Sequence, residues 1–275
     1  MTTEPTPRVV GAILRDARER RMMLPEQPAE LLGIAPETVL ALESGRHCVS
    51  TAELTALTRL YRCGQDTWAL RRLLALGTAR GDSARDSEPG YARRLAACAG
   101  SALSVRWLST VLLPAALQTR DYARAVAERS TVRHGAPVPG TAAPLYVLDV
   151  RVIRRGSATA RLMAEQVEHL LDLVDSGTRI RVVGEEHPIA QPPEHLVELD
   201  LPAGRVLARR GESGVDYHRS DSLAARIDAA LAVTDRTSTY EALEQAAASH
   251  RALAETGTAQ SSWQTSIEGR KADVR

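Results

Sequence analysis

Apolar residues recur at helical spacing through the first 80 residues, with short breaks between the runs. Ile13, Leu14 and Ala17 give a first helix an apolar stripe, and Pro36 to Ser44 forms a third helix with proline at its favoured first position. A short second helix over 28–32 precedes the tight turn at Gly33, and Thr51 to Tyr61 forms a fourth helix. The pattern therefore predicts a four- or five-helix module over residues 8–80.

The middle of the chain is less regular. Residues 81–90 lack large apolar side chains and hold two glycines and one proline, which is typical of a linker. Residues 91–132 have a helical pattern interrupted at Pro114, and the proline- and glycine-rich residues 135–144 predict a loop. Either Ser50 or Thr51 can cap the fourth helix, so both remain candidates.

In the last part of the chain, the spacing of apolar residues is helical in some segments and strand-like in others. Ser157 to Val174 has a helical stripe that Gly177 ends, whereas Arg179 to Val183, His195 to Leu201 and Arg205 to Ala208 read as strands. Gly211 to Gly214 is typical of a hairpin turn, and residues 222–254 are helical again. We expect a mainly α fold with a smaller α+β part. In it an N-terminal helix-turn-helix module precedes a C-terminal helical and small-sheet domain over 91–254 and a disordered tail over 255–275.

Composition narrows the class of protein. The 35 basic and 34 acidic residues leave a net charge of +1, so the whole molecule carries no strong field. Three cysteines without paired spacing exclude a disulfide framework and a CxxC zinc site. The polar N-terminus is no signal peptide and no apolar run is long enough to span a membrane, so we expect a cytoplasmic protein. The excess of arginine over lysine and the many alanines are typical of a GC-rich genome.

Helix, turn containing glycine and helix is the layout of a helix-turn-helix motif. Leu31 to Val39, followed by Leu-Glu-Ser-Gly-Arg at 42–46, resembles the XRE (phage-repressor-like) family. The resemblance implies a transcriptional regulator whose third helix enters the major groove. It makes Val39 and Leu42 core residues. The residues that it places on DNA, with Arg46 on a phosphate, are Glu37, Thr38, Leu40, Ala41 and Arg46.

Three departures from that family favour a second interpretation, in which the module keeps the helix-turn-helix fold but no longer binds DNA. Leu24 and Pro25 stand where the family has a serine-glutamine pair that contacts DNA, and Pro28 replaces a core leucine. We therefore expect the second helix to begin near Pro28. Leu40 and Ala41 cannot hydrogen-bond a base edge. With 11 basic and 9 acidic residues over 1–80, the module has a net charge of only +2. The basic first-helix face, Arg15 to Arg21, supports DNA binding only modestly.

The segment Leu112 to Val126 resembles a motif of an actinobacterial XRE family with a WhiJ-like or antitoxin-like C-terminal domain of unknown function. The resemblance implies a C-terminal domain that senses a small molecule or docks a small partner protein. We expect a homodimer, since twofold dimers fit DNA half-sites one helical turn apart. Gln118, Thr119 and Tyr122 are the candidate ligand or partner residues. The alternative, that they stabilise the corner between the loop and the helix, stays open.

An acid–base role is the weakest candidate chemistry. His187, His195 and His218 lie near carboxylates, but their spacing matches no metal motif, and no phosphate loop or nucleophile elbow occurs. We expect no metal and no cofactor, and the residues favour a role that is not enzymatic. The alternative is a recruited scaffold whose helix-turn-helix no longer binds DNA and whose C-terminal pocket acts as an enzyme in specialised metabolism.

Overall fold

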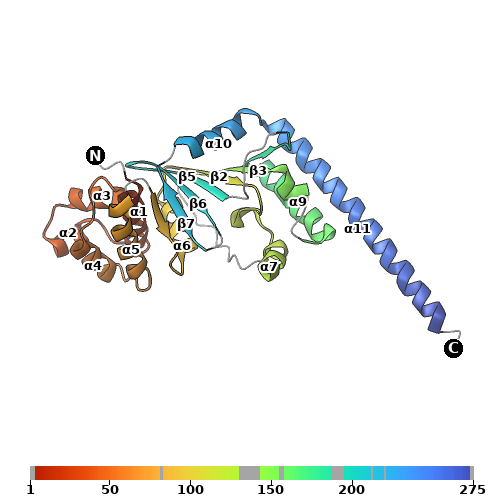
Figure 1. Cartoon of the computed structure of the whole chain (residues 1–275), viewed down its shortest axis with the longest axis horizontal. Coiled ribbons are helices and arrows are strands. Elements are labelled where there is room, and N and C mark those ends of the chain that lie inside the picture. The colour runs from red at the N-terminus through yellow and green to blue at the C-terminus, as the bar shows by residue number, and fades with distance from the viewer. Residues whose placement is uncertain are drawn as a thin grey trace.

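The N-terminal part of the chain is a five-helix module. A computed structural model describes residues 4–80, 83–129, 143–154, 158–186, 195–211, 213–219 and 221–272. The first five helices lie together at one end of the molecule (Figure 1). They are α1 (Pro5–Glu19), α2 (Glu26–Leu32), α3 (Pro36–Ser44), α4 (Thr51–Leu60) and α5 (Asp66–Arg80).

The ends of these helices follow from local sequence. Ser50, rather than Thr51, caps α4 in a capping box: its hydroxyl accepts from the Glu53 amide and the Glu53 carboxylate accepts from the Ser50 amide. Helix α2 begins at Glu26, two residues before Pro28, near which the sequence predicted its start, so Pro28 lies in the first turn. Proline is tolerated in the first turn of a helix, where its missing N–H would have no intrahelical partner.

The rest of the chain is built on a seven-stranded sheet in the order β1-β7-β6-β5-β2-β3-β4. Strands β2, β3 and β4 run parallel to one another, and all other neighbours are antiparallel. The strands are β1 (Ser83–Asp86), β2 (Ser104–Ser109), β3 (Leu145–Asp149), β4 (Arg179–Val183), β5 (His195–Leu201), β6 (Gly204–Arg210) and β7 (Val215–His218).

The remaining helices surround this sheet. The described residues also contain a 3-10 turn, η1 (Ala115–Leu117), and six further helices. They are α6 (Tyr91–Gly100), α7 (Arg120–Arg129), α8 (Val150–Arg154), α9 (Ala160–Asp175), α10 (Asp221–Ala232) and α11 (Arg236–Ala272). The fold is therefore mainly α with a sheet in its C-terminal part, as the sequence predicted.

Three strands lie where the sequence did not predict them. Strand β1 occupies part of the predicted linker 81–90, and β2 interrupts the predicted helical stretch 91–132. Strand β7 follows the predicted hairpin turn, in which the Gly211 amide donates to the Gly214 carbonyl at 2.9 Å. The helix α11 continues to Ala272, through the residues for which a disordered tail was expected. The predicted loop 135–144 lies mostly outside the described residues.

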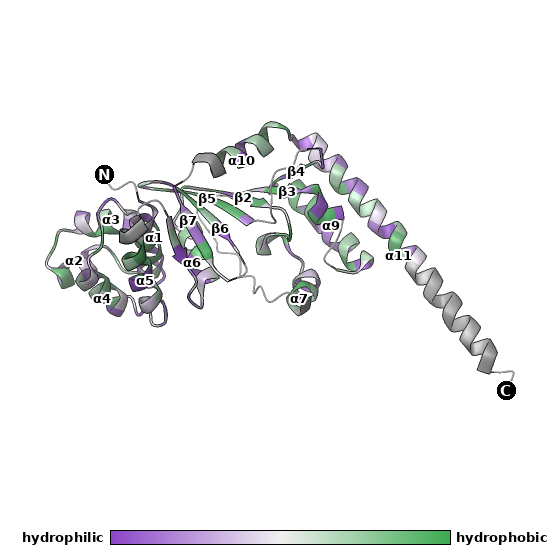
Figure 2. Cartoon of the chain, in the orientation of Figure 1, coloured by the Kyte–Doolittle hydropathy of each residue, from purple (hydrophilic) through white to green (hydrophobic). Residues whose placement is uncertain are grey.

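The two faces of the sheet have different cover. Cross-strand partners share a face, so the register places Tyr217, Ala208, Val197 and Trp107 on one face and Leu207, Leu196 and Leu108 on the other. The first face packs against α1 and α6 at one end and against α9 and α11 at the other. The second face packs against α10. Figure 2 shows hydrophobic residues on α1 and on the central strands.

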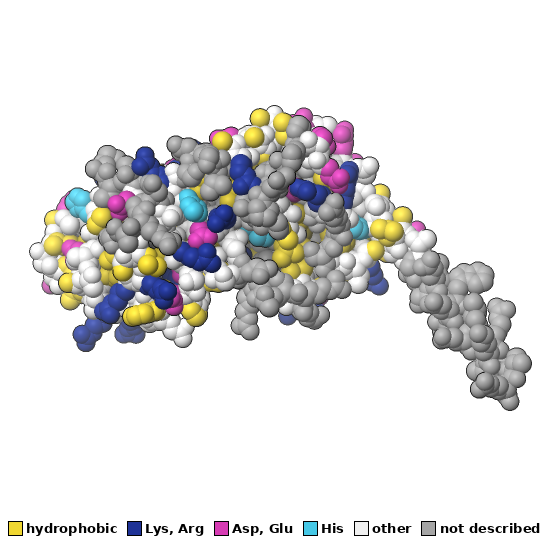
Figure 3. Space-filling view, viewed as in Figure 1, with side chains coloured by type: hydrophobic (Ala, Val, Ile, Leu, Met, Phe, Trp, Pro, Cys, Tyr) yellow, Lys and Arg dark blue, Asp and Glu magenta, His cyan; other side chains and the backbone are white. Residues whose placement is uncertain are grey.

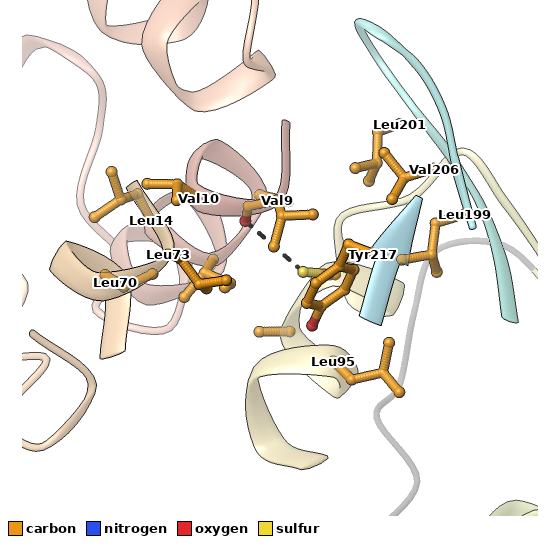
Figure 4. Packing of buried hydrophobic residues seen from close by; sticks show 14 of the residues in the cluster. Val9, Val10, Leu14, Leu70, Leu73, Leu95, Leu199, Leu201, Val206 and Tyr217 are labelled. Carbon is orange, nitrogen blue, oxygen red and sulfur yellow. Dashed lines mark hydrogen bonds between the residues drawn. The ribbon is translucent and has the colours of Figure 1, made fainter. Parts of the chain in front are cut away.

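Helix α1 packs both against the other helices of the five-helix module and against the sheet. One hydrophobic cluster contains Val9 and Leu14 of α1, Leu70 of α5, and Tyr217 and Leu199 of the sheet (Figure 4). The thiol of Cys98 on α6 donates to the Val9 carbonyl at 3.8 Å. Residue Arg8 donates from Nη1 to the Arg205 carbonyl on β6 at 3.1 Å. The five-helix module is thus packed onto the sheet through its first helix.

Candidate nucleic-acid interface

Helices α2 and α3 form the helix-turn-helix. Gly33 ends α2 in the left-handed conformation with φ of 65°, which glycine adopts without steric cost. On α3, Val39 and Leu42 are buried in the core, as predicted. Glu37 and Leu40 are exposed, and Thr38 and Ala41 are half-buried.

A buried ion pair holds α3 against α1. The Arg18 guanidinium donates from Nε and Nη2 to the Glu43 carboxylate at 2.8 Å, and the Tyr61 hydroxyl donates to Glu43 Oε1 at 3.1 Å. Burial raises the pKa of Tyr61, so the hydroxyl keeps its proton and acts as a donor. Burial acts to lower the pKa of Arg18, but the hydrogen bonds and charge of Glu43 raise it overall. Arg18 is therefore a structural residue and not part of an exposed basic face.

Two glycines let α1 and α3 approach closely. A Cβ atom on Gly11 would lie 2.5 Å from the Leu42 carbonyl oxygen, and one on Gly45 would lie 2.4 Å from the Arg8 Cα. Gly45 also ends α3 with φ of 76°. Backbone contact of this kind fixes the orientation of α3 relative to α1.

The charge of the α2–α3 surface is mixed. Arg46 and His47 are exposed directly after α3, and Arg46 Nε donates to the Ser44 hydroxyl at 3.1 Å. The exposed Glu26, Glu30 and Glu37 lie on α2 and α3 themselves. Figure 3 shows apolar, acidic and basic side chains interspersed over the visible face of the module. The basic side chains of this surface therefore lie in the loop directly after α3, and not on α2 or α3 themselves.

The candidate residues near Pro114 form the corner between η1 and α7. Gln118 Nε2 donates to the Leu113 carbonyl at 2.7 Å, and the Tyr122 amide donates to the Thr119 hydroxyl at 3.2 Å. Tyr122 is fully buried in the core. These contacts are those expected if the three residues stabilise the corner.

The sequence analysis did not identify a fourth residue that belongs to this corner. The buried Gln166 of α9 accepts from the Thr119 amide and donates to the Leu117 carbonyl, both at 2.7 Å. A glutamine beside Val167 on the apolar stripe of a predicted helix was the signal that could have found it. These two hydrogen bonds of Gln166 link the start of α7 to α9.

The two acid–base candidates among the described residues, His195 and His218, do not come together. His195 and His218 point from opposite faces of the sheet, because the register pairs His195 with Arg210 and His218 with Leu207, three positions apart on β6. His195 Nδ1 lies 3.2 Å from the Ser109 hydroxyl. Burial lowers the pKa of His218 below its ordinary value of 6.5, and Arg209 adds to this effect. His187 lies outside the described residues.

No cluster of metal-ligating side chains occurs among the described residues. None of the helices in the described part of the chain is long and apolar enough to cross a lipid bilayer.

Comparison with known proteins supports the N-terminal assignment. Residues 9–70 match a family of helix-turn-helix domains. Neither the curated proteins nor the solved structures gave a match. The matched range covers all of α2, α3 and α4, with the turn between α2 and α3. It also covers most of α1 and the first part of α5. This domain suggests a DNA-binding regulator.

Proposed function

We propose that the protein is a DNA-binding transcriptional regulator of the XRE type. The observation that carries the proposal is the presentation of α3. Its buried side is fixed by Val39, Leu42 and the Arg18–Glu43 pair, and its opposite side carries Glu37 and Leu40 into solvent. A recognition helix held in this way can enter the major groove.

The finer parts of the proposal rest on the sequence resemblance. They are a cytoplasmic homodimer that binds two half-sites, and a C-terminal domain that senses a small molecule or docks a partner protein. Glu37, Thr38, Leu40 and Ala41 would meet base edges, and Arg46 would meet a phosphate. Leu40 and Ala41 would contact thymine methyl groups, since neither side chain has a hydrogen-bonding group.

The surface charge favours a second candidate function. The exposed Glu26, Glu30 and Glu37 repel phosphate, and Leu31 and Leu40 are exposed apolar side chains on the same two helices. A module of this kind would keep the helix-turn-helix fold and use it as a scaffold or protein-docking surface.

A salt titration separates the two functions. Duplexes selected from a random-sequence pool by the full-length protein are labelled, and their dissociation constants are measured by fluorescence anisotropy at several salt concentrations. A regulator gives a linear fall of log K with log salt whose slope corresponds to several phosphate contacts. A flat response, or no duplex enriched by selection, contradicts the regulator and favours the docking module.

A charge variant tests the position of the interface. Arg46→Ala should weaken binding about equally for all duplexes and reduce the salt slope by about 1, as expected for a phosphate contact. The control is Arg161→Ala, which removes an exposed arginine from α9 in the C-terminal part. Equal effects of the two variants would contradict a role for Arg46 at the interface.

A further inference from the structure

A cavity of about 600 Å³ lies where the five-helix module meets α6. Its walls come from the end of α1, the turn between α4 and α5, and α6. Five arginines line it: Arg20, Arg21, Arg62, Arg93 and Arg94. The volume lies within the range of about 300–1,000 Å³ that small-molecule sites occupy.

Carboxylates neutralise only part of this charge. Asp66 accepts hydrogen bonds from Arg93 and Arg94, both at 2.8 Å. Asp86, behind the cavity wall, accepts from Arg94 at 2.6 Å. At the end of α1, the Asp16 carboxylate oxygen Oδ2 lies 2.9 Å from Arg20 Nε. Three carboxylates, two of them in the cavity lining, therefore pair with Arg20, Arg93 and Arg94, which leaves two of the five positive charges without a carboxylate partner.

The unbalanced charges belong to Arg21 and Arg62. Arg21 Nε donates to the Tyr61 carbonyl at 2.8 Å, a contact that orients its guanidinium but brings no negative charge. Arg62 is exposed and makes no polar side-chain contact among the described residues. Burial raises the pKa of the Cys63 thiol to about 11, so this thiol adds no negative charge to the cavity.

The backbone of Arg62 is itself unusual. Its φ of 50° lies in the left-handed region, and the Cys63 amide donates to the Thr58 carbonyl while the Arg62 amide donates to the Arg59 carbonyl. This is a Schellman motif, in which the left-handed position usually takes glycine. An arginine here strains the backbone, and its side chain is one of those that line the cavity.

We propose that this cavity binds a small phosphate-bearing organic ligand. The Arg21 and Arg62 guanidinium groups supply the donor geometry that matches a phosphate. The apolar side chains of Ile13, Ala17 and Ala97 form the wall against which the organic part packs. The ligand would contact α1, the α4–α5 turn and α6 together, so it would bind at the junction between the helix-turn-helix module and the rest of the chain.

Calorimetric titration of the full-length protein tests the site. The probes are inorganic pyrophosphate and ADP, with adenosine as the uncharged control. We expect at least one phosphate probe to bind, and adenosine to bind at least about ten-fold more weakly than ADP if ADP is bound. Because the titration contains no DNA, its outcome is independent of the proposed regulator function.

The variant Arg62→Gly makes the test specific. Glycine favours the left-handed backbone, so the variant keeps the fold, which an unchanged or higher urea midpoint verifies. It should weaken binding of the phosphate probe by about ten-fold or more. The matched control is Arg59→Ala, which removes a nearby exposed arginine of α4 that does not line the cavity. The absence of binding of both phosphate probes at millimolar concentration, or equal binding by Arg62→Gly, would overturn the proposal.

Discussion

The buried Arg18–Glu43 pair predicts a large loss of stability when its carboxylate is removed. The side chains of Arg18 and Glu43 are only 7% and 1% exposed, so water cannot replace the lost partner. Breaking a buried pair from one side costs about 3–5 kcal/mol, and the Tyr61 hydroxyl loses its acceptor for about 1 kcal/mol more. We therefore expect Glu43→Ala to lower the free energy of unfolding by about 4–6 kcal/mol.

Urea unfolding followed by circular dichroism measures this loss. Folded proteins have free energies of unfolding of about 5–15 kcal/mol, so the variant should lose a large part of its stability and its midpoint should fall clearly. The control Glu37→Ala removes an exposed carboxylate from the same helix and should change the free energy by less than about 1 kcal/mol. A loss below about 1 kcal/mol in Glu43→Ala would refute the reasoning, because it would mean that the charged groups are solvated.

Three further predictions concern the backbone, a helix cap and pH. Gly45→Ala should destabilise by about 2–4 kcal/mol because its Cβ meets the backbone of α1, whereas Gly33→Ala, with nothing within 4 Å, should cost about 1 kcal/mol; equal losses in urea unfolding would contradict this. Ser50→Ala should cost about 1 kcal/mol and Thr51→Ala less, as thermal unfolding would reveal, and the reverse order would show that Thr51 is the cap. The lowered pKa of His218 means that the unfolded chain binds its proton first, so the stability it contributes is present above pH 6.5 and falls as the pH drops below this value. The variant His218→Gln should reduce that slope in unfolding measured across this range, and an unchanged slope would exclude His218 as its source.

Elements with strong local signals were predicted at their observed bounds. Helix α3 and strands β4 and β5 run over the residues that the sequence indicated. Proline at the start and glycine at the end define α3, and alternating apolar residues define the two strands. In each case the signal lies within the element itself.

Elements that depend on distant partners were missed. Ser83–Asp86 has no strand pattern of its own, and it becomes β1 because it pairs with β7, where Arg85 lies opposite Asp216. The burial of Arg18 and Arg94 also had no local signal, since each arginine is buried only because a carboxylate from another element meets it. For the candidate site, the sequence placed Val39 and Leu42 in the core correctly, but it gave no indication of the arginine-lined cavity. That cavity forms only when α6 packs against the module.

The contacts of α1 with the sheet also determine when this helix can finish folding in the cell. The Arg205 carbonyl that accepts from Arg8 is synthesised 197 positions later. At about 5–20 residues per second, the first helix waits about 10–40 s for its partner strand. During this interval the face around Val9 stays exposed to water and to chaperones. Folding of the helix-turn-helix module is therefore completed only after most of the chain has left the ribosome, which couples production of the folded module to synthesis of the C-terminal part.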